Sequence, residues 1–510
     1  MRDKLFLFIL IFLGVIFYTL TLKGIYGNPP GKSIKNNLDQ ASKPFELSPE
    51  RDRFLLTQSL AENKSFALSQ ELADAAYPDV GYYKGKFYIF FAPGISLFAL
   101  PFYSIGKYFN LAQVASYSVI TLFAIGNMIF LYKISREILK LPVWISILTS
   151  LIFAFGSTSW SYAVTLYQHH ATTFFIISGF YAVWKYKQKK KFGWVWGFIT
   201  WLNFALAGLI DYPNIILMAP VMLYFFLSSC NITPIRSKLT ISLRTAFLTT
   251  SVIFFLITAL HGYYNYVNFG DFKRVSGSLT GYKAIKEQKL FEKKNGQAQI
   301  TKIGDNKQPI HFFKQENFIH SSSTLLFSRD RGLFLYSPIF ILGILGIFYK
   351  LKKMSMETAI LLGTMGSIFF LYSSWGDPWG GYAFGPRYMI PVMAVLSLFI
   401  GIWLSKFKYQ LLGKLITFLL FIYSSGIALV GVLTTNAVPP KVEADYFKVP
   451  YNFILNFQYL LQGRSSSYIY NQYFANHISL LGFYLILTEV LIMIVYGVLF
   501  FLPKLKVYED

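Results

Sequence analysis

Apolar and polar stretches alternate along the whole chain in a pattern typical of a membrane protein. Apolar runs of roughly 17 to 25 residues, each long enough for one helix to cross a bilayer, recur between short polar segments. They lie near residues 5–22, 111–132, 142–160, 170–186, 193–210, 213–230, 244–264, 333–350, 357–374, 387–405, 413–434 and 478–502. The pattern predicts an all-α polytopic membrane protein with about twelve transmembrane helices.

Residues 89–107 are apolar enough to form a thirteenth span, and the positions of Lys and Arg decide against it. If this segment crossed the membrane, the basic loops 133–140 and 185–191 would lie outside. Without it, every short basic loop falls on the cytoplasmic side, as the positive-inside rule requires. Those loops are 133–140, 185–191, 236–244, 350–353, 406–414 and 504–506. We therefore expect both termini in the cytoplasm.

The segment 89–107 then lies at the outer membrane interface or re-enters the membrane. It contains Pro93, Gly94 and Pro101, which disfavour one straight helix. This apolar segment ends the first outer loop.

The composition supports a membrane protein over a nucleic-acid-binding one. Of 510 residues, 54% are hydrophobic and 14% charged, against about 25% charged in a soluble domain. The net charge of +23 comes mainly from short basic runs between apolar segments, where Lys and Arg set topology and meet anionic lipid headgroups. We expect contacts with membrane lipids and none with nucleic acid. A single cysteine, Cys230, excludes an internal disulfide and a cysteine metal cluster.

The predicted topology divides the loops unequally between the two faces. Three long loops, 23–110, 265–332 and 435–477, face outside, whereas the cytoplasmic loops are short and basic. Residues 1–434 form the transmembrane core, and residues 435–510 add the third outer loop, the last span and a cytoplasmic tail. Since functional residues concentrate on loops held by a rigid scaffold, we expect the chemistry at the outer surface.

A transporter or flippase of lipid-linked sugars is the competing class. Such a protein is expected to carry ionisable groups near the membrane midplane. The predicted spans hold one near a centre, Glu489, while His261 lies near the end of another. Glu489 either has a function or is protonated and hydrogen-bonded to a neighbouring Tyr, so it favours transport only weakly.

Polar chemistry concentrates in the first outer loop, within residues 48–101. Glu50 and Asp52 are candidate catalytic carboxylates, although Ser48-Pro49-Glu50 is also typical of a helix start with a cap, a first-turn Pro and an acid. Asp79 fits a turn as well as a site. No acid and His cluster has the spacing of metal ligands. We predict no cofactor, and a divalent metal is left open.

Short motifs follow one another in a fixed order over most of the chain. They are ERDRF at 50–54, QSL at 58–60, YPD at 77–79, KGKFY at 84–88, APG at 92–94, LP at 100–101, QHH at 168–170, RGLFLYSP at 331–338 and WGGYAFGPRY at 379–388. This ordered set resembles the family 39-type glycosyltransferases of the type C superfold, which include dolichyl-phosphate-mannose protein mannosyltransferase-like and aminoarabinose-transferase-like enzymes.

The resemblance implies transfer of a hexosyl or pentosyl group from a polyprenyl-phosphate donor to an acceptor hydroxyl or amine, with inversion. Family members usually carry an acidic residue just after the first span. Spacing to Arg53 and Phe54 favours Glu50 for that place, and residue type favours Asp52. A carboxylate that takes the acceptor's proton typically contributes about 10²–10⁴-fold.

The resemblance also implies how the leaving phosphate is held. Arg387 is the first candidate, and Arg331 and Arg53 follow, because a guanidinium meets phosphate oxygens in a two-pronged geometry. Asp79 would be a second carboxylate of the site. The further candidates for substrate contacts are Tyr388, His169, His170 and Lys84.

The acceptor stays open between protein, a lipid A-like lipid and cell-wall glycan. The expected location is the plasma membrane of a prokaryote, with the active site on the extracytoplasmic side. Besides the transporter, a non-catalytic membrane assembly partner that kept the fold is an alternative to the enzyme.

Overall fold

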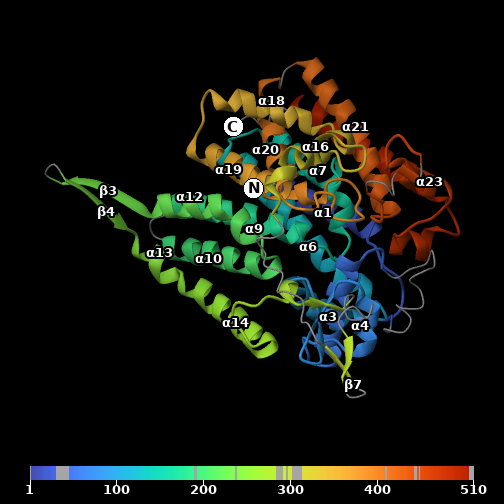
Figure 1. Ribbon diagram of the computed structural model, residues 1–510. Helices are drawn as coiled ribbons and strands as arrows, with labels where there is room; N and C mark the ends of the chain where they lie inside the picture. The colour runs from blue at the N-terminus through green and yellow to red at the C-terminus, as the bar shows by residue number, and fades with distance from the viewer. Residues whose placement is uncertain are drawn as a thin grey trace.

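The computed structural model describes residues 2–29, 45–188, 192–235, 238–282, 291–294, 297–300, 313–407, 410–440, 445–446 and 448–504. Within these ranges nearly all regular structure is helical (Figure 1). Elements labelled η are single 3₁₀ or π turns.

The first part of the chain forms α1 (Arg2–Leu20), α3 (Ser48–Glu62), α4 (Gln70–Ala76), β1 (Val80–Tyr83), β2 (Lys86–Ile89), α5 (Gly94–Tyr108), α6 (Ala112–Lys133), η1 (Ile134–Ile138), α7 (Val143–Phe155) and α8 (Ser159–Ala163). The middle forms α9 (His169–Gln188), α10 (Gly193–Ile210), α11 (Asn214–Leu217), α12 (Ala219–Ser229), β3 (Cys230–Ile235), β4 (Lys238–Leu243), α13 (Thr245–Thr250), α14 (Val252–Phe269), η2 (Ser276–Ser278), β5 (Thr280–Gly281), β6 (Phe291–Lys294) and β7 (Gln297–Ile300). The last part forms η4 (Gln315–Asn317), α16 (Phe318–Phe327), α17 (Leu333–Tyr336), α18 (Phe340–Leu351), α19 (Met356–Ser373), η5 (Arg387–Met389), α20 (Ile390–Lys406), α21 (Leu411–Leu433), α23 (Ile454–Leu461), η6 (Tyr470–Phe474), α24 (Leu480–Tyr496), η7 (Gly497–Phe501) and η8 (Leu502–Lys504).

Eight helices in the described part of the chain are long and apolar enough to cross a membrane. They are Asp3–Leu20, Ala112–Ile138, Gly193–Ile210, Thr245–Phe269, Met356–Ser373, Arg387–Lys406, Leu411–Leu433 and Leu480–Lys504. Each coincides with a predicted span, and α9 covers a ninth. The prediction of an all-α polytopic membrane protein is confirmed.

Three predicted spans are shorter as helices than their apolar runs. The run 142–160 is divided into α7 and α8, 213–230 into α11 and α12, and 333–350 into α17 and α18. Pro338 separates α17 from α18, and α12 has a Pro in its first turn, because Pro cannot donate the backbone hydrogen bond that a helix interior needs. Hydropathy alone does not resolve these breaks.

Helix α20 lies at the centre of the bundle, because 89% of the residues in its apolar stretch are buried. In the helix that contains α14, only 6% of the corresponding residues are buried. Helix α18 packs tightly along α20 because Gly343 and Gly346 face the α20 backbone. A Cβ at Gly346 would lie 2.0 Å from the Phe399 carbonyl oxygen, so the close approach requires a residue without a side chain. Helix α14 lies along α10, and the β3–β4 hairpin extends beyond the ends of α12 and α13 (Figure 1).

The first loop forms a compact unit against one end of the bundle. Helix α3 packs on α5, which packs on α6. Strand β1 pairs antiparallel with β2, with Val80 opposite Ile89, and with β5 of the second long loop, with Gly81 opposite Gly281. The two loops are thus joined by backbone hydrogen bonds.

The predicted interface segment is one continuous helix from Gly94 to Tyr108, with Pro101 inside it. The segment 89–107 as a whole is not one helix, as expected, because Ile89 ends β2 and the helix begins only at Gly94. At 15 residues, however, the helix spans only about 22 Å, less than the roughly 30 Å of a hydrocarbon core.

Basic loops meet acidic partners at the bundle end away from α3. Arg136 contacts Asp3 at 3.4 Å, and Lys185 contacts Glu137 at 2.5 Å. Residues 189–191, 236–237, 408–409 and 505–506 of the predicted basic loops lie outside the described residues. Residues 238–243 of the expected loop 236–244 form strand β4.

Candidate functional site

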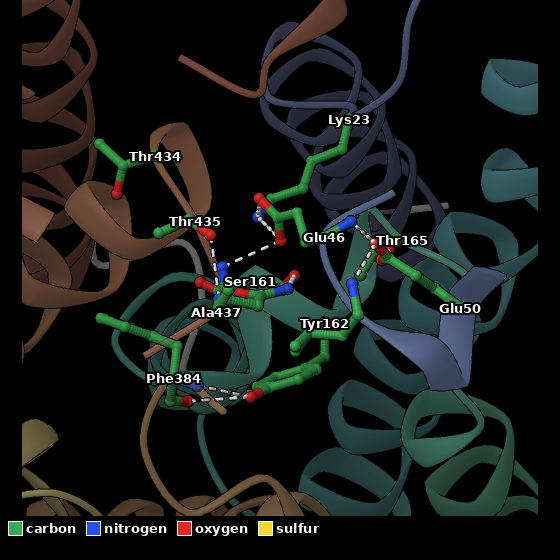
Figure 2. A network of polar contacts seen from close by, with 12 residues as sticks. Lys23, Glu46, Glu50, Ser161, Tyr162, Thr165, Phe384, Thr434, Thr435 and Ala437 are labelled. Carbon is green, nitrogen blue, oxygen red and sulfur yellow. Dashed lines mark hydrogen bonds and ion pairs between the residues drawn. The ribbon is translucent and has the colours of Figure 1, made fainter. Parts of the chain in front are cut away.

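Helix α3 begins with a capping arrangement in which Glu50 is the central side chain. Its Oε1 accepts hydrogen bonds from the backbone N–H groups of Glu46 at 2.6 Å and Leu47 at 3.3 Å. Its Oε2 accepts a hydrogen bond from the Thr165 hydroxyl (Figure 2). A carboxylate that satisfies N–H groups before the first helical turn stabilises the helix start. Both oxygens of Glu50 are therefore occupied by the protein.

A buried ion pair ties this helix start to two distant segments. Lys23, at the end of α1, donates to Glu46 at 3.0 and 3.1 Å, and the lysine is only 2% exposed. The Glu46 carboxylate also accepts the backbone N–H of Asn436 at 2.9 Å. Figure 2 shows Glu46 between Lys23 and the segment that follows α21. The network fixes α3 relative to the bundle.

Burial and a neighbouring acid raise the pKa of Glu50 to about 7. Burial is the largest cause, and the Glu46 charge adds to it, while the Thr165 hydrogen bond and the Lys23 charge act in the opposite direction. The Glu50 carboxyl thus titrates near neutral pH.

Asp52, two residues after Glu50, is fully buried, and only one of its two carboxylate oxygens has a hydrogen bond to a residue that the structure describes. Its Oδ1 accepts from Arg51 Nε at 3.2 Å, and its Oδ2 has no hydrogen-bond partner among the described residues. Burial raises the pKa of Asp52 well above its ordinary value, the Arg51 charge opposes the shift, and the Asp79 charge adds to it. Asp79 accepts a hydrogen bond from the Ser48 hydroxyl, so the predicted carboxylates Asp52 and Asp79 share one region.

Arg53 follows Asp52 in α3, and only 1% of its surface is exposed. Its Nη1 donates to the Pro49 carbonyl at 2.7 Å, its guanidinium lies 4.4 Å from the ring centre of Phe91, and Nε has no partner in the described part of the chain. Burial lowers the pKa of Arg53 to about 10. Asp211 opposes this shift most, and the positive charge of Arg387 adds to it.

Arg387 begins η5, after the loop that contains the Gly380-Gly381 pair. Its Nη2 donates to the Gly380 carbonyl at 2.6 Å, while Nε and Nη1 have no partner within the described ranges. Gly380 has φ +65°, and a Cβ there would lie 3.0 Å from Arg387 Nε. The left-handed backbone and the close approach both require glycine. The glycine motif thus positions the arginine.

Aromatic side chains surround Arg387. The rings of Tyr167 and Tyr388 each lie 5.4 Å from its guanidinium. Tyr388 stacks on Tyr372 at 4.5 Å and contacts His169 at 5.9 Å. Neither His169 Nε2 nor the Tyr167 hydroxyl has a partner among the residues described. Buried polar groups are normally paired, so this concentration of unpaired atoms makes the region a candidate binding site.

Three of the predicted site residues lie apart from this cluster. His170 is bonded on both ring nitrogens, Nε2 to the Ser159 carbonyl at 2.8 Å and Nδ1 to Asn127 at 3.3 Å. Lys84 is exposed at the β1–β2 turn, 5.5 Å from the ring of Tyr83.

The third is Arg331, which is buried but committed to backbone carbonyls. It donates to Trp379 at 3.0 Å, Asp330 at 2.6 Å, Gly381 at 2.7 Å and Val438 at 3.2 Å. These bonds hold the loop that carries Gly380 and Gly381. Because Arg387 donates to the Gly380 carbonyl of that loop, Arg331 helps to position Arg387 without touching it.

Asp211 is not part of the ordered motifs, yet it belongs to the cluster. It lies at the end of α10, accepts Gln168 Nε2 at 3.1 Å and interacts electrostatically with Arg53 and Arg387. Burial raises the pKa of Asp211, and Arg53 opposes the shift. The signal was its position at the same face as QHH 168–170. Glu46, Thr165 and Tyr167 carry no motif that would single them out.

The geometry brings Asp52, Arg53, Asp211 and Arg387 together at one end of the bundle. Two guanidiniums with free donors can bind an anion such as a phosphate, and a carboxylate with a free oxygen can accept a proton. In the described part of the chain, no group of three or more His, Cys, Asp or Glu side chains could hold a metal ion.

No family model and no curated protein sequence matches the chain. Solved structures match its fold. ArnT from Cupriavidus metallidurans in the apo state aligns with a TM-score of 0.51 at 12% identity, covering 98% of this chain and 78% of that chain. The structure of the same ArnT bound to undecaprenyl phosphate aligns with a TM-score of 0.51 at 13% identity, covering 96% of this chain and 77% of that chain.

The archaeal oligosaccharyltransferase AglB from Archaeoglobus fulgidus aligns with a TM-score of 0.43 at 12% identity, over 86% of this chain and 57% of that chain. The likeness to ArnT confirms the fold that the ordered motifs predict, the type C superfold. At this level of identity it concerns the fold alone.

Proposed function

We propose that this chain is a membrane glycosyltransferase that moves a sugar from a polyprenyl-phosphate donor to an acceptor hydroxyl or amine at the extracytoplasmic face, with inversion. One observation carries the proposal. The buried guanidiniums of Arg53 and Arg387 keep nitrogens without hydrogen-bond partners, and the neighbouring Asp52 keeps an unpaired oxygen, among the described residues.

The two arginines suit the donor phosphate. When the bond between C1 of the sugar and the phosphate oxygen breaks, its electron pair stays on the phosphate. Donors that already point at this position stabilise the developing charge without reorganising. The likeness of the fold to a protein that binds undecaprenyl phosphate supports a lipid-phosphate donor.

Asp52 is the proposed base. As the acceptor oxygen or nitrogen forms its bond to C1, its proton passes to Asp52 Oδ2, which has no other partner in the described part of the chain. Glu50 is the weaker candidate because backbone N–H groups and Thr165 occupy both of its oxygens. We assign Glu50 to positioning: it fixes the start of α3, and thereby Asp52 and Arg53.

The test is sugar transfer in proteoliposomes that contain undecaprenyl-phosphate-linked sugars. We expect Asp52→Asn to lower the rate by about 10²–10⁴-fold and Arg387→Ala by about 10²–10³-fold. Glu62→Gln is the matched control, since Glu62 ends the same helix but lies outside the cluster. Its carboxylate pairs with Lys107 at a distance of 2.6 Å.

Wild-type rates in both Asp52→Asn and Arg387→Ala would refute the mechanism. A lipid-linked sugar that crosses the bilayer without being consumed would instead support the transporter.

A further inference from the structure

Glu489 is an exposed carboxylate near the middle of the last membrane-crossing helix. It is the tenth residue of Leu480–Lys504, a helix of 25 residues. At about 1.5 Å per residue it lies roughly 14 Å from the helix start, close to the midplane of a hydrocarbon core about 30 Å thick.

The side chain of Glu489 has no hydrogen bond or ion pair with any described residue. The alternative in which it bonds to a neighbouring Tyr is therefore wrong: Tyr484, five residues earlier on α24, donates to the Gly426 carbonyl at 3.2 Å. Ionisable groups within membrane helices normally face the protein interior or a water-filled cavity. Glu489 faces outward instead.

Its neighbours on the same face of α24 are large and exposed. Leu485 is 55% exposed, Ile486 46%, Met493 57% and Tyr496 44%. With Glu489 they follow the spacing of three, four and seven residues that forms one helix face. Only 22% of the residues in the apolar stretch of this helix are buried, so a partner helix can lie along the whole face.

We propose that this face of α24, defined by Leu485, Ile486, Glu489, Met493 and Tyr496, binds a transmembrane helix of another protein that carries a Lys or Arg at the same depth. Charge complementarity identifies the partner. An ion pair at the midplane relieves the cost of a lone carboxylate in lipid, and the flanking apolar side chains pack against the rest of the partner helix. The inference is independent of the proposed catalysis.

The test uses two Leu-rich transmembrane peptides, one with a single central Lys and one with Leu in its place. The protein is labelled through Asn476→Cys in a Cys230→Ser background, because Cys230 is its only natural cysteine. Energy transfer to labelled peptide in liposomes then reports binding. We expect the Lys peptide to bind roughly fivefold to thirtyfold more tightly than the Leu peptide, and Glu489→Gln to remove this preference.

Met493→Leu is the matched control on the same face and should keep the preference. Equal binding of the two peptides, or a preference that persists in Glu489→Gln, would overturn the proposal. Energy transfer between two labelled copies that Glu489→Gln abolishes would identify a second copy as the occupant and overturn it as well. Glu489→Gln should unfold at the wild-type temperature. A large fall would assign the carboxylate an internal role and equally contradict the proposal.

Discussion

Arg53 on α3 and Arg387 in η5, just before α20, lie close enough for their charges to interact. Burial lowers the pKa of Arg53 to about 10, and the positive charge of Arg387 adds to that shift. Two like charges held together away from water are unfavourable, and Asp211 compensates only part of that charge. A bound anion would complete the compensation, and the nitrogens of both guanidiniums that have no partner within the described chain could donate hydrogen bonds to it.

Undecaprenyl phosphate should therefore bind to the wild-type protein and raise its unfolding temperature. Each guanidinium that bonds to the phosphate contributes about 1.5–3 kcal/mol, so Arg53→Ala and Arg387→Ala should each weaken binding by about tenfold to more than a hundredfold. Titration of the lipid in a thermal-unfolding assay measures this. Arg464→Ala, at the exposed Arg464 near Tyr459, is the control. Equal binding by all variants would place the phosphate elsewhere.

Glu50 should make the stability of the protein depend on pH. Its pKa of about 7 in the folded protein lies above the roughly 4.3 of an exposed Glu. The folded state holds the proton more tightly, so the free energy of unfolding falls as pH rises from about 4.3 to about 7. The side chain in Glu50→Gln cannot titrate. Over this pH interval the free energy of unfolding should therefore fall less in the variant than in the wild type, by up to about 3 kcal/mol.

Thermal unfolding in detergent between pH 4 and pH 8 measures the difference. Glu62→Gln provides the control, because hydrogen bonds from Lys107 and Tyr103 outweigh burial and lower the pKa of Glu62. Its removal should leave the fall in stability above pH 5 unchanged. Parallel curves for wild type and Glu50→Gln would contradict the assignment of Glu50.

Much of the bundle could be predicted from the sequence because the bilayer fixes the length of a span, so that each long apolar helix appears as an apolar run. The breaks at Pro338 and before α12 were missed because a hydropathy window averages over them. The β3–β4 hairpin was missed because its basic residues fitted a cytoplasmic loop, although KLTISL at 238–243 alternates as a strand does.

The candidate site was predictable only in part. Motif order made Asp52, Arg53 and Arg387 candidates, but the argument that favours Asp52 over Glu50 depends on Thr165, which is 115 residues from Glu50 in the sequence. The sequence made both Arg387 and Arg331 phosphate-binding candidates, with Arg387 first. Only the fold shows that backbone carbonyls saturate Arg331. Partners of this kind are set by tertiary contacts that no local motif encodes.

Gly94→Ala should disturb the contact between the first loop and the bundle. A Cβ at Gly94 would lie 2.4 Å from the Leu209 carbonyl oxygen, just before Asp211. Relief requires a backbone shift between α5 and α10, which we expect to cost about 1–3 kcal/mol and to lower transfer by moving Asp211. Gly366→Ala, where nothing lies within 4 Å, should be neutral or stabilising. Thermal unfolding and transfer rates of both variants check this.

Arg331→Lys should destabilise the loop before Arg387. A lysine cannot reproduce the fork that donates to Trp379, Gly381 and Val438. We expect a loss of about 2–4 kcal/mol in the free energy of unfolding and a lower rate at saturating donor. If Arg331 instead bound the phosphate directly, the variant would keep its stability and show a raised KM for the donor.

The pH dependence of transfer should separate Asp52 from Glu50. Burial raises the pKa of Asp52 well above its ordinary value, and only the deprotonated carboxylate can accept the acceptor's proton. The transfer rate should therefore rise with pH until Asp52 is ionised. Glu50→Gln should keep this rise, because its role is to hold α3, whereas Asp52→Asn should leave a low rate without it. A rise that Glu50→Gln removes and Asp52→Asn keeps would make Glu50 the base.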